Sequence, residues 1–237
     1  MIAVVSSTIA PSPTPSHDGA RTTLAPEVRL AHTQGTVASL VTLGAKEIFI
    51  ADNSPGDWVR DRTAELAPAR LLHFNQPPVR NKGIGEMWLL LSMLEFLPQH
   101  EPIMKISGRY RVGPNTELKL RKDDDVAGKI YRHARLQTLS TRCYLIRNRA
   151  VAQRLWDRTV DEIYADAARI RGPRSLWRIV QNSLRPAHDH LRYGDPAIAV
   201  ETAIHRAIRY LPLRLNAVDN LDVEGILGSW TNPAVKE

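Results

Sequence analysis

The sequence contains little cysteine, with Cys143 as the single thiol among 237 residues. One cysteine excludes an internal disulfide framework and any zinc site that is built from several cysteines. We interpret Cys143, which stands in an apolar run, as a buried thiol and not as a nucleophile. This cysteine usage is typical of a reducing compartment, and we therefore expect a cytoplasmic protein.

Long apolar runs are also missing from the chain. No run of eighteen apolar residues occurs, and residues 1–10 are too short and too polar for the apolar part of a signal peptide. We therefore expect no membrane span and no cleaved leader. Arginine-rich stretches such as residues 169–185 are compatible with contact at a membrane surface, which would be peripheral.

Acidic residues are outnumbered, because Lys and Arg total 32 while Asp and Glu total 25, which gives a net charge of +7 and a pI near 9.8. A basic surface predicts an anionic partner, which is a nucleotide, phosphate, nucleic acid or an acidic membrane face. The hydrophobic content of 43% suffices for a sizeable core. We expect an α/β part over residues 1–148 and a mainly helical C-terminal part over 149–237, within one compact unit.

Apolar periodicity predicts the order β-α-β-α-β in the first third of the chain. These five elements are expected at residues 2–7, 25–43, 47–51, 58–66 and 70–74. A strong helical pattern follows at residues 81–97, with strands at 103–106, 129–135 and 138–146. Helical patterns at residues 150–171, 174–191 and 196–211 and a last strand at 213–218 complete the chain. The pattern predicts an α/β fold with a mixed sheet flanked by helices.

Small polar side chains follow three of the predicted strands. The first strand ends in Ser6, Ser7 and Thr8, and the second ends in Asp52 and Asn53. The strand at residues 103–106 runs into Lys105-Ile-Ser-Gly-Arg-Tyr-Arg111, which adds three cations to Ser107 and Gly108. Ligands of α/β proteins bind beyond the carboxyl ends of parallel strands. The sequence therefore predicts an anion-binding edge, although Asp, Asn and Ser also favour ordinary turns.

The segment Asn81-Lys-Gly-Ile-Gly-Glu86 opens the strongest predicted helix. Backbone amides at a helix start favour anions, and glycines allow a ligand to approach them closely. We therefore expect a ligand to approach the backbone at Asn81, Lys82 and Gly83.

The two segments Ile48-Phe-Ile-Ala-Asp-Asn-Ser54 and Asn81-Lys-Gly-Ile-Gly-Glu86 resemble the start of GT-A-type glycosyltransferases. In that fold a strand ending in Asp contacts the nucleotide, and an Asn-x-Gly segment opens a helix beside the sugar. The resemblance covers about the first half of the chain and implies a GT-A-like (Rossmann-like) sheet. It implies a nucleoside-diphosphate sugar as donor, bound by Ser6, Ser7, Thr8, Asp52 and residues 81–86. The acceptor would be a glycan, a lipid-linked glycan or another hydroxyl compound.

The sequence departs from that family at the next strand, where most members carry an Asp-x-Asp metal motif. Here Lys105, Arg109 and Arg111 stand instead, and these cations would neutralise the departing diphosphate in place of a divalent ion. We therefore expect a metal-independent transfer that requires no cofactor. The alternative is that the arginines form ordinary surface ion pairs.

Asp123 and Asp125 are the alternative metal ligands, because dense carboxylates suit Mg²⁺ or Mn²⁺. The residues before them are charged and do not form a buried strand, and an acidic run in such a setting is typically a solvated loop.

Glycosyl transfer with inversion needs a general base for the acceptor hydroxyl. The plausible bases are Glu86, Glu201, His205 and Glu224. We expect Glu201 or Glu224 to act as the catalytic base, with Arg109 as a further catalytic residue. Glu201 shares a helix face with His205, four residues on, which also suits a surface ion pair. Glu86 is a weaker candidate, because an acid in the first turn of a helix often stabilises the helix itself.

Two other functions fit parts of this sequence. A sugar nucleotidyltransferase is the first, but its usual glycine-rich loop after the first strand is replaced by Pro11-Ser-Pro-Thr-Pro15. A nucleic-acid-binding protein is the second, suggested by the positive charge and the arginine-rich helices. Nucleic-acid binding would weaken steeply with salt because counterions are released, whereas binding of a free nucleoside diphosphate would weaken much less.

Overall fold

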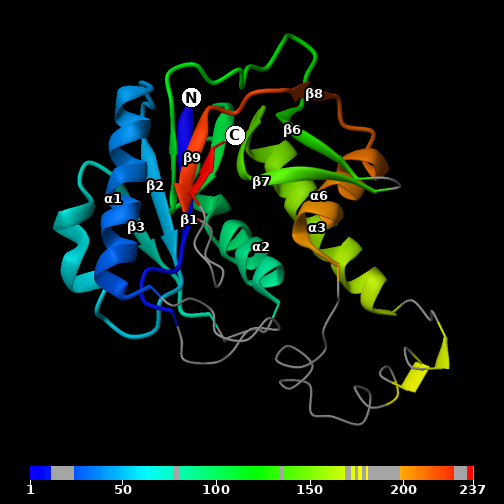
Figure 1. Ribbon diagram of the computed structural model, residues 1–237, viewed down its shortest axis with the longest axis horizontal. Coiled ribbons are helices and arrows are strands. Elements are labelled where there is room, and N and C mark those ends of the chain that lie inside the picture. The colour runs from blue at the N-terminus through cyan, green and yellow to red at the C-terminus, as the bar shows by residue number, and fades with distance from the viewer. Residues whose placement is uncertain are drawn as a thin grey trace.

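A seven-stranded mixed sheet in the order β3-β2-β1-β4-β7-β6-β8 forms the centre of the computed structural model (Figure 1). The structure describes residues 1–11, 24–76, 81–133, 136–168, 198–226 and 234–236, together with 172, 173, 176, 177 and 180. The strands of this sheet are β1 (Ile2–Ser7), β2 (Ile48–Asp52), β3 (Arg70–His73), β4 (Ile103–Ser107), β6 (Val126–His133), β7 (Leu136–Ile146) and β8 (Leu215–Val218). Strands β1 to β4 are parallel to one another, while β7 runs antiparallel to both β4 and β6. The predicted α/β class with a mixed sheet flanked by helices is confirmed.

Helices cover both faces of this sheet (Figure 1). Helix α1 (Pro26–Thr42) packs on one face, where its Leu30, Val37 and Leu40 join Val5 and Ile50 in the core. The other face carries α2 (Lys82–Ser92), α3 (Arg149–Ala168) and α6 (Val200–Tyr210). Alternate residues of each strand point to opposite faces, so that Val4 and Val5 belong to different cores. None of the described helices has both the length and the apolar character to cross a membrane.

A second, three-stranded sheet in the order β10-β9-β5 lies on the α1 side of the molecule. Its strands are β5 (Tyr110–Val112), β9 (Val223–Ile226) and β10 (Ala234–Lys236), all joined antiparallel. The sequence patterns do not predict β5 or β10 as strands, because three residues are too few to show an alternation. Tyr110 and Val112 are nevertheless buried between this sheet and α1, which positions the segment that follows β4.

Most predicted elements lie within a few residues of the observed ones. The helix expected at residues 81–97 ends earlier, because α2 stops at Ser92 and a short 3₁₀ turn, η2 (Leu94–Phe96), follows it. The helix expected at 58–66 is the 3₁₀ helix η1 (Arg60–Leu66). Gly44 adopts a φ of 80° just after α1, a conformation that favours glycine at a helix end. Most of the helix expected at 174–191 lies outside the described residues, as does most of the segment 169–185 that was considered for membrane contact.

Candidate functional site

The polar ends of β1, β2 and β4 meet at one edge of the large sheet. The register pairs Ser6 with Ser107 and Ser7 with Asp52, and it pairs Asp52 with His73 on β3. We call this edge, marked by Ser6, Asp52, His73 and Ser107, the carboxyl edge, because the parallel strands end there. The sequence prediction that Ser6, Ser7, Asp52, Ser107 and Gly108 lie close together agrees with this register.

A buried cation, Lys105, organises the carboxyl edge from within the sheet. Its side chain is 0% exposed, and its ammonium lies 2.5 Å from Oε1 of Glu86 on α2. The same ammonium donates to Oγ of Ser107 at 3.1 Å and to the carbonyl oxygen of Thr141 on β7 at 2.5 Å. Because Lys105 is enclosed and already paired with a carboxylate, its role differs from the expected one. It positions neighbouring groups, and it does not present a free charge to a diphosphate.

Glu86 links β1 and β4 to helix α2. Its Oε1 also accepts a hydrogen bond of 2.7 Å from the hydroxyl of Ser6. Burial raises the pKa of Glu86, but the charge and hydrogen bond of Lys105, the Ser6 hydrogen bond and the charge of Arg109 outweigh it and lower the pKa overall. Glu86 is therefore an ionised anchor of the network. It does not cap its own helix, a role that Asn81 fills.

An irregularity in β7 turns Thr141 toward α6. Gly128 of β6 pairs with Tyr144, whereas Ile130 pairs with Leu139, so β7 bulges between these two pairs. The hydroxyl of Thr141 donates to Oε1 of Glu201 at 3.1 Å, while its carbonyl oxygen accepts from Lys105. Glu201, in the first turn of α6, is thereby attached to the same network as Ser107 and Glu86.

Asp52 and Asn53 shape the loop that follows β1. The two carboxylate oxygens of Asp52 accept from the backbone amides of Ile9, at 2.9 Å, and of Ser54, at 2.8 Å. The Asn53 side chain accepts from the hydroxyl of Thr8 at 2.5 Å. These residues lie at the carboxyl edge as predicted. The two hydrogen bonds of Asp52, however, come from backbone amides of the protein itself. Asp52 is therefore well placed to hold the loop, whatever ligand the loop meets.

The start of α2 also lies at the carboxyl edge. Asn81 is the N-cap, and its Oδ1 accepts from the amide of Ile84 at 3.1 Å. A Cβ atom on Gly83 would lie 2.7 Å from Cβ of Val200, so this glycine allows α6 to approach α2 closely. The glycine thus serves helix packing at this point. Lys82 is exposed beside it.

Arg109 follows a tight turn at the end of β4. The amide of Arg109 donates to the carbonyl of Ser107 at 2.7 Å, and the carbonyl of Gly108 accepts from the hydroxyl of Thr33 on α1 at 3.1 Å. A Cβ on Gly108 would lie only 3.1 Å from that hydroxyl oxygen, so the turn packs tightly on α1. Arg109 is thereby fixed between α1 and the carboxyl edge.

Arg111 and Glu224 lie on the small sheet, on the opposite face of the large sheet from Glu201. The register of β5 and β9 pairs Arg111 with Glu224. The guanidinium of Arg111 lies over α1, where a Cβ on Gly35 would be 2.6 Å from its Nε. The two predicted bases are thus far apart in the fold, and only Glu201 joins the Lys105 network.

Asp123 and Asp125 lie at the other edge of the sheet. Asp125 immediately precedes β6, whose Val126 pairs with Ile146, and Ile146 pairs with Ile103 at the start of β4. At about 3.3 Å per residue, this row is roughly 13 Å from Ser107. Asp123 lies 3.3 Å from Arg214, and Asp125 accepts from the backbone amide of Arg214 at 3.0 Å. These carboxylates anchor the loop before β6.

A divalent metal ion needs several ligand atoms close together. Within the part of the chain that the structure describes, no group of three or more His, Cys, Asp or Glu side chains could hold one. Strand β4 ends in Ser107 and is followed by Gly108 and Arg109, and Asp52 already accepts hydrogen bonds from two backbone amides. Cations and neutral donors of this kind suit an anion.

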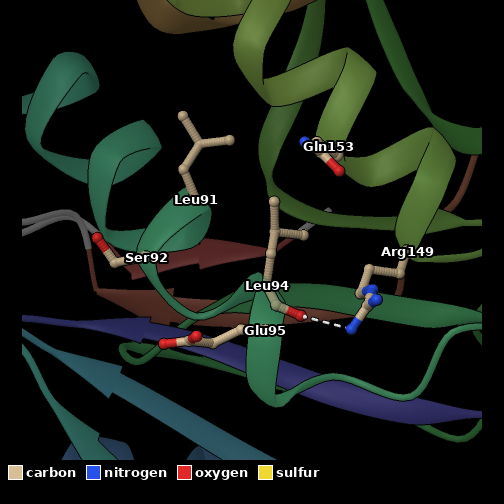
Figure 2. A pocket seen from close by; sticks show the side chains of 6 residues that line it. All are labelled: Leu91, Ser92, Leu94, Glu95, Arg149 and Gln153. Atoms are coloured by element: carbon tan, nitrogen blue, oxygen red, sulfur yellow. Dashed lines mark hydrogen bonds between the residues drawn. The ribbon is translucent and has the colours of Figure 1, made fainter.

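A separate groove of about 670 Å³ lies between the end of α2 and the start of α3 (Figure 2). Figure 2 shows the side chains that line it, which are Leu91, Ser92, Leu94, Glu95, Arg149 and Gln153. Arg149 donates to the carbonyls of Leu94 and Leu97 at 3.5 and 3.1 Å. The chain enters α3 directly after Ile146, so this groove is at the edge of the sheet opposite Ser107. No predicted site residue lines it, and we assign it no role.

Three residues near the carboxyl edge were missed in the sequence. Thr141 could not be recognised, because its orientation depends on the bulge in β7. Arg29 and His32 of α1 could have been recognised in the sequence, because basic residues three positions apart lie on the same face of a helix. The interpretation of Cys143 is confirmed, because its thiol is buried and burial raises its pKa to about 12 despite the opposing charge of Lys105.

Comparisons with known proteins give only distant structural similarity. No protein-family model matches the chain, and no curated protein matches it. A nucleoside-diphosphate-sugar pyrophosphorylase from Vibrio cholerae RC9 aligns over 94% of each chain, with 10% identity and a TM-score of 0.46. The galactosyltransferase LgtC, in complex with donor and acceptor sugar analogs, aligns over 88% of this chain and 70% of that one, with 10% identity and a TM-score of 0.46. An active-site mutant of LgtC aligns over 97% and 88%, with 12% identity and a TM-score of 0.48. Values this low transfer no activity to the present chain.

Proposed function

We propose that this protein is a glycosyltransferase that moves a sugar from a nucleoside diphosphate to a hydroxyl acceptor, without a divalent ion. The observation that supports the proposal is that a cation and a carboxylate both lie at the carboxyl edge. Arg109 follows Ser107 there, and Glu201 is held there by Thr141. Ligands of parallel α/β sheets bind at this edge, and a glycosyl transfer needs both charges in one place.

The positive charge has the task of stabilising the leaving group. When the bond between the anomeric carbon and the diphosphate oxygen breaks, its electron pair departs with the nucleoside diphosphate. Arg109 is the arginine nearest to the end of β4, and a guanidinium offers paired donors to phosphate oxygens. Arg111 extends the positive field along α1. The interaction strengthens as charge develops on the leaving oxygen, which accelerates the reaction.

Glu201 has the task of general base in an inverting transfer. The acceptor oxygen forms its bond to the anomeric carbon, and the proton of the acceptor hydroxyl passes to the Glu201 carboxylate. The Thr141 hydroxyl holds Oε1, so the orientation of the carboxylate is fixed before substrate arrives. Glu224, the cross-strand neighbour of Arg111 on the small sheet, is the alternative base.

A nucleotide screen followed by a turnover assay tests this proposal. We expect one of UDP, GDP, CDP, dTDP or ADP to raise the melting temperature in the presence of EDTA, because a ligand of the native state stabilises it. The matching nucleoside-diphosphate sugar should then release that nucleoside diphosphate, faster when a hydroxyl acceptor is added. Formation of pyrophosphate from a nucleoside triphosphate and a sugar phosphate would identify a nucleotidyltransferase instead. Binding to DNA or RNA alone, with a steep salt dependence, would contradict the proposal.

A further inference from the structure

A half-buried side of helix α1 near its start carries an unusual concentration of positive charge. Arg29 and His32 are three residues apart on this helix, and Gly35, on which Arg111 lies, follows after three more. The hydrogen bond from Thr33 to the carbonyl of Gly108 brings Arg109 to the same helix. Four basic side chains from three segments therefore converge on one helix face. We call Arg29, His32, Arg109 and Arg111 the α1 basic cluster.

Like charges at this density repel one another unless an anion lies among them. Burial and the charge of Arg109 lower the pKa of Arg29 to about 10, even though Asp52 acts in the opposite direction. Arg29 itself is engaged, since its guanidinium donates to the carbonyls of Thr8 and Ile9. Of the other members, Arg111 is exposed, whereas Arg109 and His32 are half-buried.

His32 supplies an independent sign of a missing partner. Its Nδ1 atom is buried and has no hydrogen-bond partner in the structure. An unsatisfied buried polar atom costs free energy, and a bound water or ion is one way in which a native protein satisfies such an atom. The neighbouring donors are all cationic, and an oxyanion would satisfy them together with the imidazole.

We propose that the imidazole of His32, with the guanidinium groups of Arg109 and Arg111, binds one oxyanion, the terminal phosphate of the nucleoside diphosphate. This inference rests on the proposed function, because it assigns the donor's diphosphate to these three side chains. It adds a histidine to the site, contributed by the helix that follows β1. Imidazole and guanidinium groups both donate to phosphate oxygens, and several such bonds hold one phosphate group.

Anion binding should be coupled to protonation of His32. Burial, followed by the charges of Arg29, Arg109 and Arg111, lowers the pKa of His32 in the free protein and so disfavours the protonated ring. A phosphate among these cations reverses the sign of the local field and raises the pKa of His32. Binding then takes up a proton, and affinity increases as pH falls.

The other charged groups near α1 do not cancel this effect. Asp52 raises the pKa of Arg29, and Glu224 is the cross-strand neighbour of Arg111 on β9. From η1, Arg62 and Glu65 lie 3.7 Å apart and balance each other. Strand β1 contributes only the neutral Ser7, whose hydroxyl lies 3.5 Å from that of Thr33.

Calorimetric titration with inorganic pyrophosphate, in two buffers of different ionisation enthalpy, tests the inference on the whole chain. We expect binding with proton uptake that tightens from about pH 8 to about pH 6. His32→Gln should weaken binding about tenfold and abolish proton uptake, because it removes one hydrogen bond to a charged group. His100→Gln, which changes an exposed histidine at the far edge of the sheet, should bind as the wild type does.

Several results would overturn the inference. They are the absence of pyrophosphate binding, binding that is the same in His32→Gln, or binding without proton uptake. Circular dichroism of His32→Gln verifies that the variant is folded, so that a loss of binding is not a loss of structure. If pyrophosphate binds as expected but no nucleoside-diphosphate sugar is consumed, the anion site stands and the proposed transferase activity fails.

Discussion

The ammonium of Lys105 lies 2.5 Å from the Glu86 carboxylate, which joins the centre of the sheet to the first turns of helix α2. Lys105 is completely buried, and around this pair the hydroxyls of Ser6 and Ser107 are both bonded. An ion pair in such a place does not simply stabilise the fold, because both charges lose their hydration. Its consequence is positional, since it aligns the polar ends of β1 and β4 and, through Thr141, the carboxylate of Glu201.

Removing the Lys105 charge should strongly destabilise the protein. Lys105→Met leaves Glu86 as an uncompensated buried charge, and we expect a loss of about 3 kcal/mol in the free energy of unfolding, measured by urea denaturation. Lys46→Met is the matched control, because Lys46 is 63% exposed in its pair with Glu101 and should lose less than about 1 kcal/mol. Equal losses in the two variants would refute the buried-pair interpretation. Adding Glu86→Leu to Lys105→Met should recover part of the stability.

Loss of Arg109 should weaken nucleotide binding without unfolding the protein. Arg109→Ala is expected to weaken nucleoside-diphosphate binding by about tenfold to a hundredfold, because a charge-assisted contact to phosphate is lost. Calorimetry measures the affinity, and Arg109→Lys should retain part of it. Arg214→Ala is the control, because Arg214 is 66% exposed and pairs with Asp123 at the opposite edge. If Arg109→Ala binds as tightly as Arg214→Ala does, the cation is not part of the donor site.

Replacing Glu201 should affect turnover and leave donor affinity unchanged. Glu201→Gln keeps the hydrogen bond from Thr141 but cannot accept the proton, so we expect kcat to fall about a hundredfold or more. Steady-state kinetics and a separate titration with nucleoside diphosphate distinguish catalysis from binding. A large loss of kcat in Glu224→Gln, with normal turnover in Glu201→Gln, would assign the base to β9.

Acidic residues before β6 should have no part in nucleotide binding. We expect Asp123→Asn to give the same nucleotide-induced rise in melting temperature as the wild type, with EDTA and with Mn²⁺, because the residue lies at the far edge of the sheet. If the rise in melting temperature needs Mn²⁺ in the wild type and disappears in Asp123→Asn, a metal site in this loop takes part in nucleotide binding.

The pH dependence of stability should report on His205. This side chain is buried in α6, and burial together with the charge of Arg209 lowers its pKa. In the unfolded chain the histidine binds a proton near its ordinary pKa of about 6.5, so the unfolded state binds more protons below that pH and stability falls. We expect His205→Gln to flatten the fall in the free energy of unfolding between about pH 7 and about pH 5.5, above the titration range of ordinary carboxylates. If the free energy of unfolding falls with pH as steeply in His205→Gln as in the wild type, the pKa of His205 is not lowered by folding.

The sequence predicted strand ends more reliably than it predicted contacts. The runs that become β1, β2 and β4 are apolar and β-branched, and burial of both faces of a parallel sheet requires such runs. Their polar ends had to meet at one edge once the strands were parallel, so the grouping of Ser6, Asp52 and Ser107 followed from local pattern. The short strands β5 and β10 carry too few residues for any periodic signal, and their pairing depends on the partner strand.

The amino-acid sequence by itself determined the α/β class, the positive charge and the polar residues that end the strands, because these depend on composition and on periodicity along the chain. Only the tertiary structure decided what each of those residues does. In the folded protein Lys105 is buried against Glu86, and Glu201 lies beside Thr141 of the bulged strand β7. Glu224 lies on the small sheet, and Asp123 lies at the opposite edge of the large sheet. The physical reason is that burial, register and ion pairing join residues far apart in the chain, and no local pattern encodes them.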